Sequence, residues 1–406
     1  MSFSSASTPP RVALIGVSGY ARVYYALLQE LQQEGAIRLS AATIVNPDRE
    51  PAIRAQLQDE GCRVYQDYRE MLARHQGEID LCCVPTGIPL HAPMTIAALA
   101  AGANVLVEKP LAPTIREVES IRAAERAARR FVAVGFQDIY AAETRVLKQR
   151  LLAGAIGPLR RIRGRGLWPR DTAYYRRNKW AGQRQVAGHW VLDSPLSNAF
   201  GHFLNLALFF AGPQAAASAA PTGVQADLLR AQRIENFDTA ALRVRTGSEV
   251  EILFYVSHSC AQNLEPELVF EGDRGRASWS YGREIRLEPA GAPAEVIALG
   301  DAHAARRAMF RQVIRKVREP AAFVCDTAMA AAHTACCQLA QESAVHAVPE
   351  SFLRREPAAT GGEQISIAGI EGLVARAWSA CQLFREAGFP WLPPAVETPS
   401  LSTPSL

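Results

Sequence analysis

The sequence has few lysines and almost no excess of charge. Only four of its 44 basic residues are lysines, and basic and acidic residues nearly balance at 44 against 40. The formal net charge of +4 is too small, and the arginines are too dispersed, for a nucleic-acid-binding surface. We therefore expect a small molecule, and no nucleic acid, as the partner.

Long apolar runs and paired metal ligands are also missing. No stretch reaches the roughly 18 to 20 apolar residues that a membrane span needs, and residues 1–10 lack the apolar core of a secretion signal. These absences predict no membrane partner and a cytoplasmic location. The eight cysteines include Cys82-Cys83 and Cys336-Cys337 but no Cys-x-x-Cys, and the histidines outside the motifs below show no ligand spacing. We expect buried reduced thiols and no metal site.

What is present is a chain of 406 residues, 49% of them hydrophobic, which is long enough for two or three domains. From Arg11 onward, short β-branched runs alternate with amphipathic helical stretches. This alternation predicts an α/β domain with a doubly wound parallel sheet over residues 11–138. Its strands are expected at residues 12–17, 39–45, 63–65, 79–84, 104–108 and 131–136.

The second half has longer alternating segments, which are typical of antiparallel strands. They are expected at residues 159–168, 224–234, 239–245, 249–256, 267–271 and 284–287. Thr246-Gly247-Ser248 favours a hairpin, and two late helices are expected at 304–318 and 326–343. The predicted class is α/β plus α+β, in which residues 139–392 form an open, mainly antiparallel sheet with helices on one face. Residues 1–10 and 393–406 are expected to be disordered.

Residues 12–22 read Val-Ala-Leu-Ile-Gly-Val-Ser-Gly-Tyr-Ala-Arg, a strand followed by a glycine-rich turn and a helix start. Rossmann domains bind the pyrophosphate of a dinucleotide in this context, on the free N–H groups of the helix. Ser18 occupies the second glycine position, where its side chain either crowds or hydrogen-bonds the pyrophosphate. The predicted cradle comprises Gly16, Ser18, Gly19, Tyr20 and Ala21, and a tight turn without a ligand is the alternative.

The end of the second predicted strand bears on the choice of cofactor. Asn46 stands where an acidic residue usually binds the ribose 2′-OH, and a neutral amide can bind that hydroxyl without repelling a phosphate. Arg49 could instead accompany a 2′-phosphate. The segment leaves NAD and NADP open, with a plain solvated turn as the alternative.

Two further segments are more specific. Residues 79–91 read Ile-Asp-Leu-Cys-Cys-Val-Pro-Thr-Gly-Ile-Pro-Leu-His, and residues 103–112 read Ala-Asn-Val-Leu-Val-Glu-Lys-Pro-Leu-Ala. Together they resemble the Gfo/Idh/MocA family (glucose-fructose oxidoreductase, inositol dehydrogenase, rhizopine catabolism). The resemblance implies that Thr86, His91 and Glu108 belong to the cofactor site, and that Lys109, before a cis proline, lies at the nicotinamide and the substrate. Ile88 replaces an asparagine that relatives often carry.

A third segment, residues 192–205, reads Leu-Asp-Ser-Pro-Leu-Ser-Asn-Ala-Phe-Gly-His-Phe-Leu-Asn. Family members carry an aspartate and a histidine here, one helical turn apart. The resemblance implies that His202 accepts the substrate proton, while Asn198 replaces the aspartate and Asp193 supplies charge from the loop. The spacing of four predicts that Asn198 and His202 share one helical face, and a satisfied core histidine is the alternative.

Residues 168–182 are rich in aromatic and cationic side chains. They favour a sugar pocket, with an oligomer interface or a structural loop as the alternative. The candidate substrate contacts are Arg170, Tyr175, Asn178 and Trp180, together with Lys109, Asn198 and His202.

The resulting hypothesis is an NAD(P)-dependent oxidoreductase that interconverts an alcohol and a carbonyl on a sugar, polyol or related compound. The resemblance implies a homo-dimer or homo-tetramer that pairs through the open sheet. Two alternatives stay open: a nucleotide-binding sensor without strong catalysis, and an NAD-retaining enzyme that cleaves glycosides.

Overall fold

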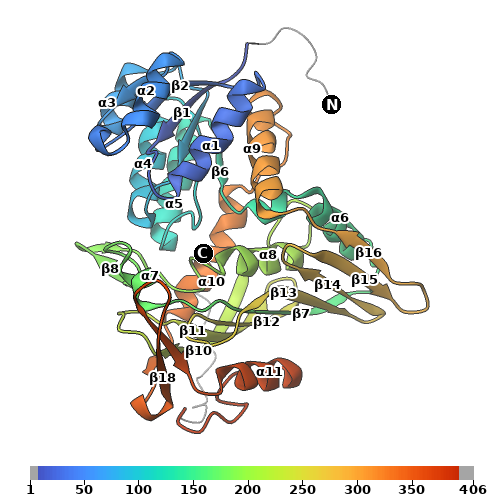
Figure 1. Ribbon diagram of the computed structural model, residues 1–406. Helices are drawn as coiled ribbons and strands as arrows, with labels where there is room; N and C mark the ends of the chain where they lie inside the picture. Colours follow the sequence, from blue (N-terminus) through green and yellow to red (C-terminus); the bar gives the residue numbers. More distant parts are fainter. Residues whose placement is uncertain (1–7, 393–406) are drawn as a thin grey trace. The chain divides into compact units, whose positions relative to one another are not determined.

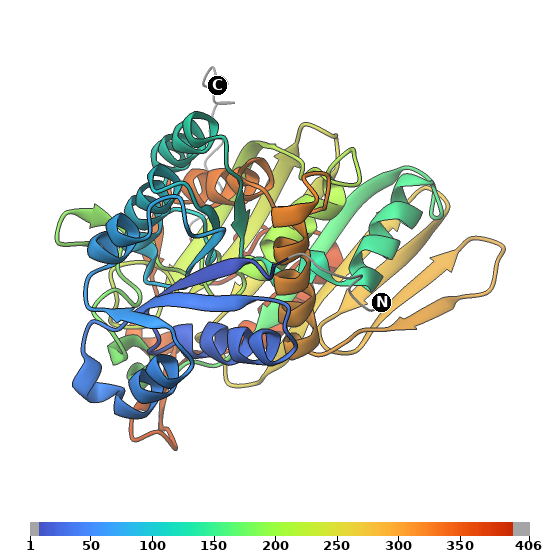
Figure 2. The same ribbon diagram turned by 90° about the horizontal axis from the view of Figure 1, so that it is seen from above.

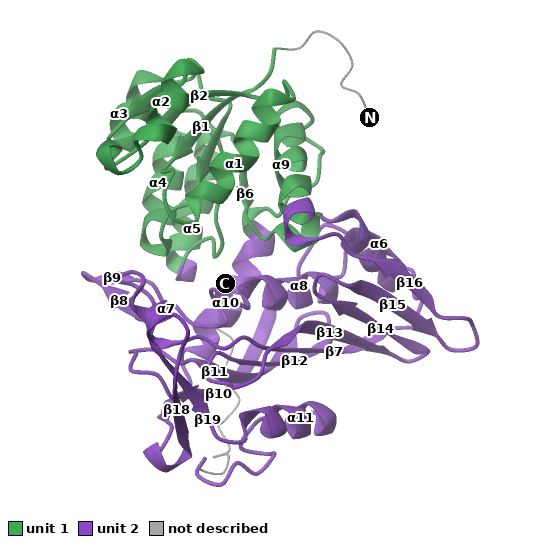
Figure 3. Cartoon of the chain, in the orientation of Figure 1, with its two compact units in different colours: residues 1–112, 116–140, 305–327 green, residues 113–115, 141–304, 328–406 purple. Residues whose placement is uncertain are grey.

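The computed structural model describes residues 8–392, which form two compact units (Figure 3). Unit 1 comprises the chain up to residue 112, with 116–140 and 305–327, and unit 2 comprises 113–115, 141–304 and the chain from 328. The sequence predicted that the first domain ends at residue 138, whereas unit 1 also includes residues 305–327. Except for residues 8–10, the segments predicted to be disordered lie outside the described residues.

Unit 1 is built on a six-stranded parallel sheet (Figure 1). Its order is β3-β2-β1-β4-β5-β6, and the reversal between β1 and β4 is the switch point at which such sheets bind ligands. The strands are β1 (Arg11–Ile15), β2 (Arg38–Thr43), β3 (Arg63–Tyr65), β4 (Leu81–Val84), β5 (Asn104–Val107) and β6 (Val132–Val134). Most residues of β1, β2, β4, β5 and β6 are buried because helices cover both faces, as the view in Figure 2 shows, whereas the edge strand β3 is partly exposed.

The helices of unit 1 connect successive strands, with one exception. They are α1 (Ala21–Gln33), α2 (Pro51–Asp59), α3 (Tyr68–Arg74), α4 (Ile88–Ala100) and α5 (Ile115–Ala128), with the 3-10 turns η1 (Pro47–Arg49) and η2 (Gln137–Tyr140). The exception is α9 (Ala302–Arg318), which the chain adds after most of unit 2. Arg307 on α9 forms ion pairs with Glu30 and Glu34 of α1, which anchors the late helix.

Unit 2 is built on a nine-stranded sheet in the order β16-β15-β14-β13-β7-β12-β11-β10-β17. Neighbours are antiparallel except for the pairs β7–β12 and β10–β17. The strands are β7 (Leu159–Leu167), β10 (Pro221–Arg230), β11 (Thr239–Thr246), β12 (Glu251–Ser257), β13 (Leu264–Gly272), β14 (Gly275–Ser280), β15 (Glu284–Pro289), β16 (Glu295–Ala298) and β17 (Val345–Ala347). The predicted fold class is confirmed, as is the hairpin between β11 and β12.

The helices of unit 2 lie on both faces of this sheet, whereas the sequence predicted only one covered face. Helix α8 (Gly201–Ala211) and helix α11 (Ile370–Ala380) lie on opposite sides of β7 and β12 (Figure 1). The other helices are α6 (Ala142–Leu152), α7 (Thr172–Arg176) and α10 (Thr327–Ala340), and two small hairpins are β8 (Gln185–Val186) with β9 (His189–Trp190) and β18 (Leu353–Pro357) with β19 (Glu363–Ile367).

Alternation along β7 explains why the second covered face was missed. Ile162, Gly164 and Gly166 point toward α8, while the intervening arginines point toward α11. In a sequence, charged residues at every second position of a strand are typical of a face exposed to solvent. The guanidinium groups of Arg163 and Arg165 lie 4.8 and 4.5 Å from the ring centre of Trp378 on α11. The arginines therefore bind the covering helix as well as their carboxylate partners.

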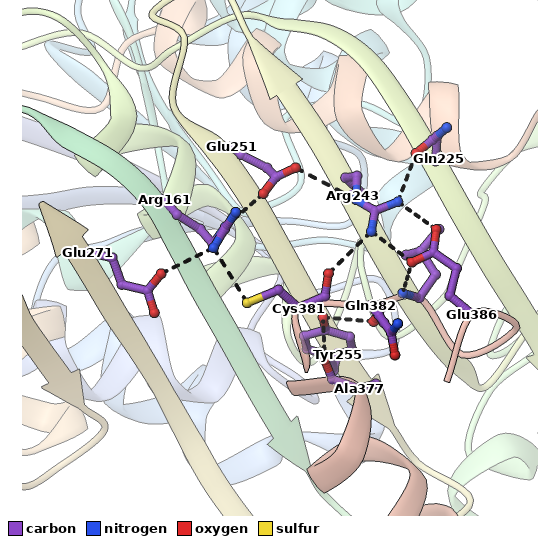
Figure 4. Close-up of polar contacts among 11 residues, drawn as sticks. Arg161, Gln225, Arg243, Glu251, Tyr255, Glu271, Ala377, Cys381, Gln382 and Glu386 are labelled. Carbon is purple, nitrogen blue, oxygen red and sulfur yellow. Dashed lines mark hydrogen bonds and ion pairs between the residues drawn. The ribbon is translucent and has the colours of Figure 1, made fainter. Parts of the chain in front are cut away.

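Figure 4 shows the polar contacts on this face. Arg161 pairs with Glu251 at 2.7 Å and with Glu271 at 3.5 Å, and Arg243 pairs with Glu386 at 2.8 Å. The Tyr255 hydroxyl donates to backbone carbonyls just after and within α11. The sheet face that was expected to be open for self-association is thus occupied, over β7, β11 and β12, by the chain's own C-terminal segment.

Candidate active site

The glycine-rich turn of unit 1 has the backbone of a phosphate cradle. Gly16 and Gly19 have φ angles of +89° and +61°, a region that side chains with a Cβ rarely adopt. The Gly16 N–H donates to Thr43 Oγ1 at the end of β2, which ties the turn to the sheet. Tyr20, at the N-cap of α1, makes no side-chain capping bond, and its 45% exposure leaves the helix start accessible. The positive end of the α1 dipole at this turn favours an anionic pyrophosphate, although the N–H groups of Ala21 and Arg22 already donate to the carbonyls of Ser18 and Gly19.

Ser18, at the second glycine position, is held by a residue that sequence reasoning missed. Its hydroxyl donates to Glu50 Oε1 at 2.8 Å, and Arg22 Nη2 donates to both Glu50 oxygens at 3.0 and 2.8 Å. The hydrogen bonds from Arg22 and Ser18 hold the pKa of Glu50 below its ordinary value. The only signal in the sequence is an acidic residue shortly after the second strand, and its partner across the turn is visible only in the fold.

Asn46 directly precedes η1 and Arg49 is its last residue, so both lie close to Glu50 in the chain. Both are exposed, and the Arg49 N–H donates to the Asn46 carbonyl at 3.0 Å. Their side chains are therefore exposed, while the backbone between them forms a short 3-10 turn.

Glu108 directly follows β5 and is buried. Its Oε1 accepts a hydrogen bond from the Tyr24 hydroxyl at 2.8 Å, and its Oε2 accepts from the Lys109 N–H at 3.0 Å. A Cβ on Gly135 would lie 2.7 Å from Glu108 Oε1, so only glycine leaves room for this carboxylate. Burial raises the pKa of Glu108, and the Lys109 charge opposes that rise. Glu108 thus positions the start of the loop that carries Lys109.

The same loop is braced from the other side by His91. This buried imidazole contacts the Pro110 carbonyl through Nδ1 at 2.7 Å and the Thr86 carbonyl through Nε2 at 3.0 Å. Burial lowers its pKa. Since both ring nitrogens face backbone carbonyls, His91 links the ends of β4 and β5 instead of presenting a nitrogen to a ligand. The Lys109–Pro110 peptide is cis.

Two buried polar atoms at this sheet edge have no hydrogen-bond partner within residues 8–392. They are Thr86 Oγ1, after β4, and Gln137 Oε1, after β6. A polar ligand along the carboxyl edge of the sheet would satisfy such atoms. Together with the glycine turn, they make the residues of unit 1 fit a dinucleotide.

In unit 2, Asp193 and Asn198 form a pair before helix α8. Asn198 Nδ2 donates to Asp193 Oδ1 at 2.8 Å, and the Gly182 N–H donates to Oδ2 at 2.7 Å. Asp193 is buried and Asn198 is partly buried. Asp193 therefore holds Asn198 in the turn before α8.

The expected helical relationship between Asn198 and His202 is wrong. Asn198 lies in a run of turns, and α8 begins only at Gly201. Pro195 opens this run, and Phe200 packs on the bare Cα of Gly166 and stacks with Trp168 at 4.9 Å between ring centres. His202 lies in the first turn of α8 and is partly exposed. Asn198 and His202 thus belong to different local structures, a turn and a helix.

Several side chains of the aromatic and cationic loop contact one another. The Arg177 guanidinium lies 3.6 Å from the Tyr174 ring centre, and Arg170 lies 5.1 Å from the same ring. Asn178 Oδ1 accepts from the N–H groups of Trp180 and of the residue after it, so it stabilises the turn. The buried Tyr175 hydroxyl has no partner in the described part of the chain, and burial raises its pKa. Of the four predicted substrate contacts in this loop, Asn178 is the one whose side-chain oxygen already accepts hydrogen bonds from the backbone.

Over residues 8–392, no group of three His, Cys, Asp or Glu side chains could hold a metal ion. None of the helices in this part of the chain is both long and apolar enough to cross a bilayer.

Comparison with known proteins matches both units in sequence. Residues 10–136 match an oxidoreductase family described by its NAD-binding Rossmann fold, and residues 144–278 match the GFO/IDH/MocA C-terminal domain. The chain belongs to the Gfo/Idh/MocA family. This confirms the resemblance drawn from residues 79–91 and 103–112, and with it the NAD(P)-binding class of the first domain.

Individual Gfo/Idh/MocA relatives match over shorter stretches. An inositol 2-dehydrogenase of Saccharopolyspora erythraea is 38% identical over 124 residues, 30% of this chain and 36% of the relative. A dTDP-3,4-didehydro-2,6-dideoxy-alpha-D-glucose 3-reductase of Streptomyces violaceoruber is 31% identical over 154 residues, 37% of this chain and 43% of the relative. The alignments thus span less than half the length of these relatives.

Solved structures share the fold over most of the chain. The WlbA dehydrogenase of Bordetella pertussis, in complex with NADH and UDP-GlcNAcA, aligns with a TM-score of 0.67 at 21% identity. The alignment covers 84% of this chain and 97% of that one. At this identity the likeness establishes the shared architecture.

Proposed function

We propose that the protein is an NAD(P)-dependent oxidoreductase that interconverts an alcohol and a carbonyl on a sugar, polyol or related polyhydroxy compound. The observation that carries the proposal is the placement of Lys109 at the carboxyl end of β5, held by Glu108 and His91 on a family NAD-binding domain. The named activities of the relatives, on inositol and on a dTDP-linked sugar, support this class of substrate.

In this proposal the dinucleotide, when bound, donates or accepts the hydride, and Gly16, Gly19, Tyr20 and Ala21 supply its pyrophosphate site. Thr86 and Gln137 offer buried polar atoms along the same sheet edge. Asn46 and Arg49 would face the adenosine ribose. The cofactor is NAD or NADP.

Lys109 stabilises the oxyanion that develops when a hydroxyl is oxidised, because a nearby ammonium group favours the deprotonated oxygen. His202 accepts the hydroxyl proton and returns it in the reverse direction. Asn198 and Asp193 are positioning residues: the Asp193 carboxylate orients the Asn198 amide in the turn before α8. Arg170, Tyr175 and Trp180 are proposed substrate contacts.

The test is an assay of the purified full chain with NAD or NADP and a panel of free polyols, free sugars and nucleotide-linked sugars. Net formation of the reduced dinucleotide supports the proposal. Release of an aglycone without net redox change would favour a glycoside-cleaving enzyme. Nucleotide binding without turnover of any panel member would favour a sensor, which the neutral Asn198 in place of the family aspartate would suit.

We also propose a homo-dimer or homo-tetramer in the cytoplasm, with a small-molecule substrate and neither a nucleic-acid nor a membrane partner. All eight cysteines are free thiols and seven are buried, which suits a reducing compartment. Because α11 occupies part of the sheet face, pairing through that face would have to use α11 itself or the outer strands β13 to β16.

A further inference from the structure

We propose that Glu50 determines the choice of cofactor and makes the protein prefer NAD to NADP. The inference rests on the proposed dinucleotide binding and adds a residue that decides between the two cofactors. Asn46, at the usual position of the deciding carboxylate, is neutral and cannot do so by charge.

Glu50 joins the two segments that flank the adenosine ribose in a Rossmann domain. It follows η1 after β2 and stands at the N-cap of α2, while its partners Ser18 and Arg22 belong to the glycine turn and the first turn of α1. The acidic residue that reads the ribose 2′-OH in such domains also follows the second strand. Glu50 therefore brings a carboxylate to the same region from a position later in the loop.

The contacts fix both the place and the charge of this carboxylate. Its side chain is only 9% exposed and accepts hydrogen bonds from Ser18 and, on both oxygens, from Arg22, whereas the Arg22 side chain is 61% exposed. A carboxylate with charged and neutral donors stays ionised at neutral pH. The loop thus carries a fixed negative charge beneath an exposed guanidinium.

This arrangement opposes a 2′-phosphate in two ways. Arginine binds phosphate through paired N–H groups, but Nη2 of Arg22 already donates to both oxygens of Glu50 and is not available for such a pair. The ionised carboxylate also repels the phosphate dianion. Without Glu50, Arg22 and the exposed Arg49 would both be available to a phosphate at this turn. A ribose hydroxyl, being neutral, meets neither obstacle.

The experiment measures dissociation constants of NADH and NADPH for the full chain, by calorimetry or by energy transfer from tryptophan. The wild-type protein should bind NADH at least about tenfold more tightly than NADPH. Glu50→Gln, which keeps the shape and removes the charge, should strengthen NADPH binding by roughly 10- to 100-fold, the effect of removing one close like charge. NADH binding should change little. Adding Arg22→Gln to Glu50→Gln should abolish most of the gain.

The matched control is Asp48→Asn, an equal charge change at an exposed residue of the same loop. It should leave the ratio of the two constants within about twofold, because an exposed charge is screened. An equal gain in Asp48→Asn would overturn the assignment to Glu50, as would an unchanged ratio in a folded Glu50→Gln. The wild-type ratio is a test that needs no variant, and a preference for NADPH would refute the proposal. Failure to bind either dinucleotide would instead refute the proposed function.

Discussion

Asn198 donates its side-chain amide to Asp193, with 2.8 Å between Nδ2 and Oδ1. The second oxygen of Asp193 accepts from the Gly182 N–H, so the carboxylate joins the aromatic loop to the turn before α8. The carboxylate that contacts position 198 thus comes from five residues earlier in the chain. A neutral residue at 198 is what this arrangement requires, since two carboxylates in contact would repel.

Asn198→Asp should therefore reduce activity. It places two carboxylates in contact, which raises the pKa of the pair and removes one hydrogen bond. Asp193→Asn should also reduce turnover, on the order of 100-fold if the loop shifts by about 1 Å. The double exchange Asp193→Asn with Asn198→Asp restores one amide and one carboxylate, and should recover part of the loss. Steady-state kinetics across pH check this, and a fully active Asn198→Asp variant would contradict the role of the pair.

Lys109→Ala should lower turnover by roughly 100- to 1,000-fold, because it removes the cation that faces the developing oxyanion. His202→Ala should lower it by roughly 100- to 10,000-fold and remove the lower-pH limb of the oxidation profile. Dinucleotide affinity should fall only modestly in both, as measured by calorimetry. Wild-type turnover in both variants would reject the proposed mechanism.

Gly19→Val should abolish dinucleotide binding, because its φ of +61° is strained for a β-branched residue and the side chain blocks the start of α1. Gly61→Val is the matched control, since Gly61 also has a positive φ of +76° and no atom within 4 Å of an added Cβ. Both should lose about 1–2 kcal/mol in the free energy of unfolding. Only Gly19→Val should lose affinity. Equal dinucleotide affinities in the two folded variants would rule out the cradle.

Lys148 should make stability depend on pH. It is 1% exposed, donates to the carbonyls of Phe209, Phe210 and Gly212 at the end of α8, and burial lowers its pKa to about 7. The unfolded chain, with a lysine pKa of about 10.4, binds more protons between pH 7 and 10. The free energy of unfolding should therefore rise with pH above 7, by about 2 kcal/mol up to pH 9, and that gain is lost as pH falls to 7.

Denaturant unfolding at pH 7 and pH 9 measures this effect. Lys148→Met should lack the rise, although it is less stable overall because three carbonyls lose their donor. Lys316→Met removes a surface lysine that donates to Pro320, and should keep the wild-type slope. Parallel slopes in all three proteins would show that Lys148 stays protonated in the fold.

Deletion of residues 370–406 should expose the apolar part of the sheet face. Helix α11 and the segment after it bury Leu253, Tyr255 and Ile367, among others, in a cluster that includes Trp378. We expect the shortened chain to self-associate with rising concentration, as light scattering would detect, and to unfold at lower temperature. Dissociation of a wild-type oligomer on deletion would instead place α11 within the interface.

Local sequence determined the first domain because its signals are short-range. Continuously apolar strands predict a parallel sheet buried on both faces. Gly16, Gly19 and Lys109 lie in short segments after a strand, and the residues next to them in the sequence are enough to predict the motif. In the second domain, alternation predicted β7, β10, β11, β12, β13 and β15, and it missed β14. Short strands such as β16 and β17 were missed because a few residues carry little periodicity.

The tertiary structure alone decided which distant groups meet. Glu50 reaches Ser18 across 32 positions, and Arg161 reaches Cys381 across 220. The alternating arginines of β7 predicted a solvated face, but Trp378 and carboxylate partners contact them. A guanidinium group can stack on an aromatic ring while it binds a carboxylate, so the same side chains suit a covered face. Asn198 lies outside the helix, in the run of turns that ends where α8 begins at Gly201. Sequence spacing specifies a residue's neighbours only within a regular element, whereas packing between elements depends on shape and charge that the whole chain supplies.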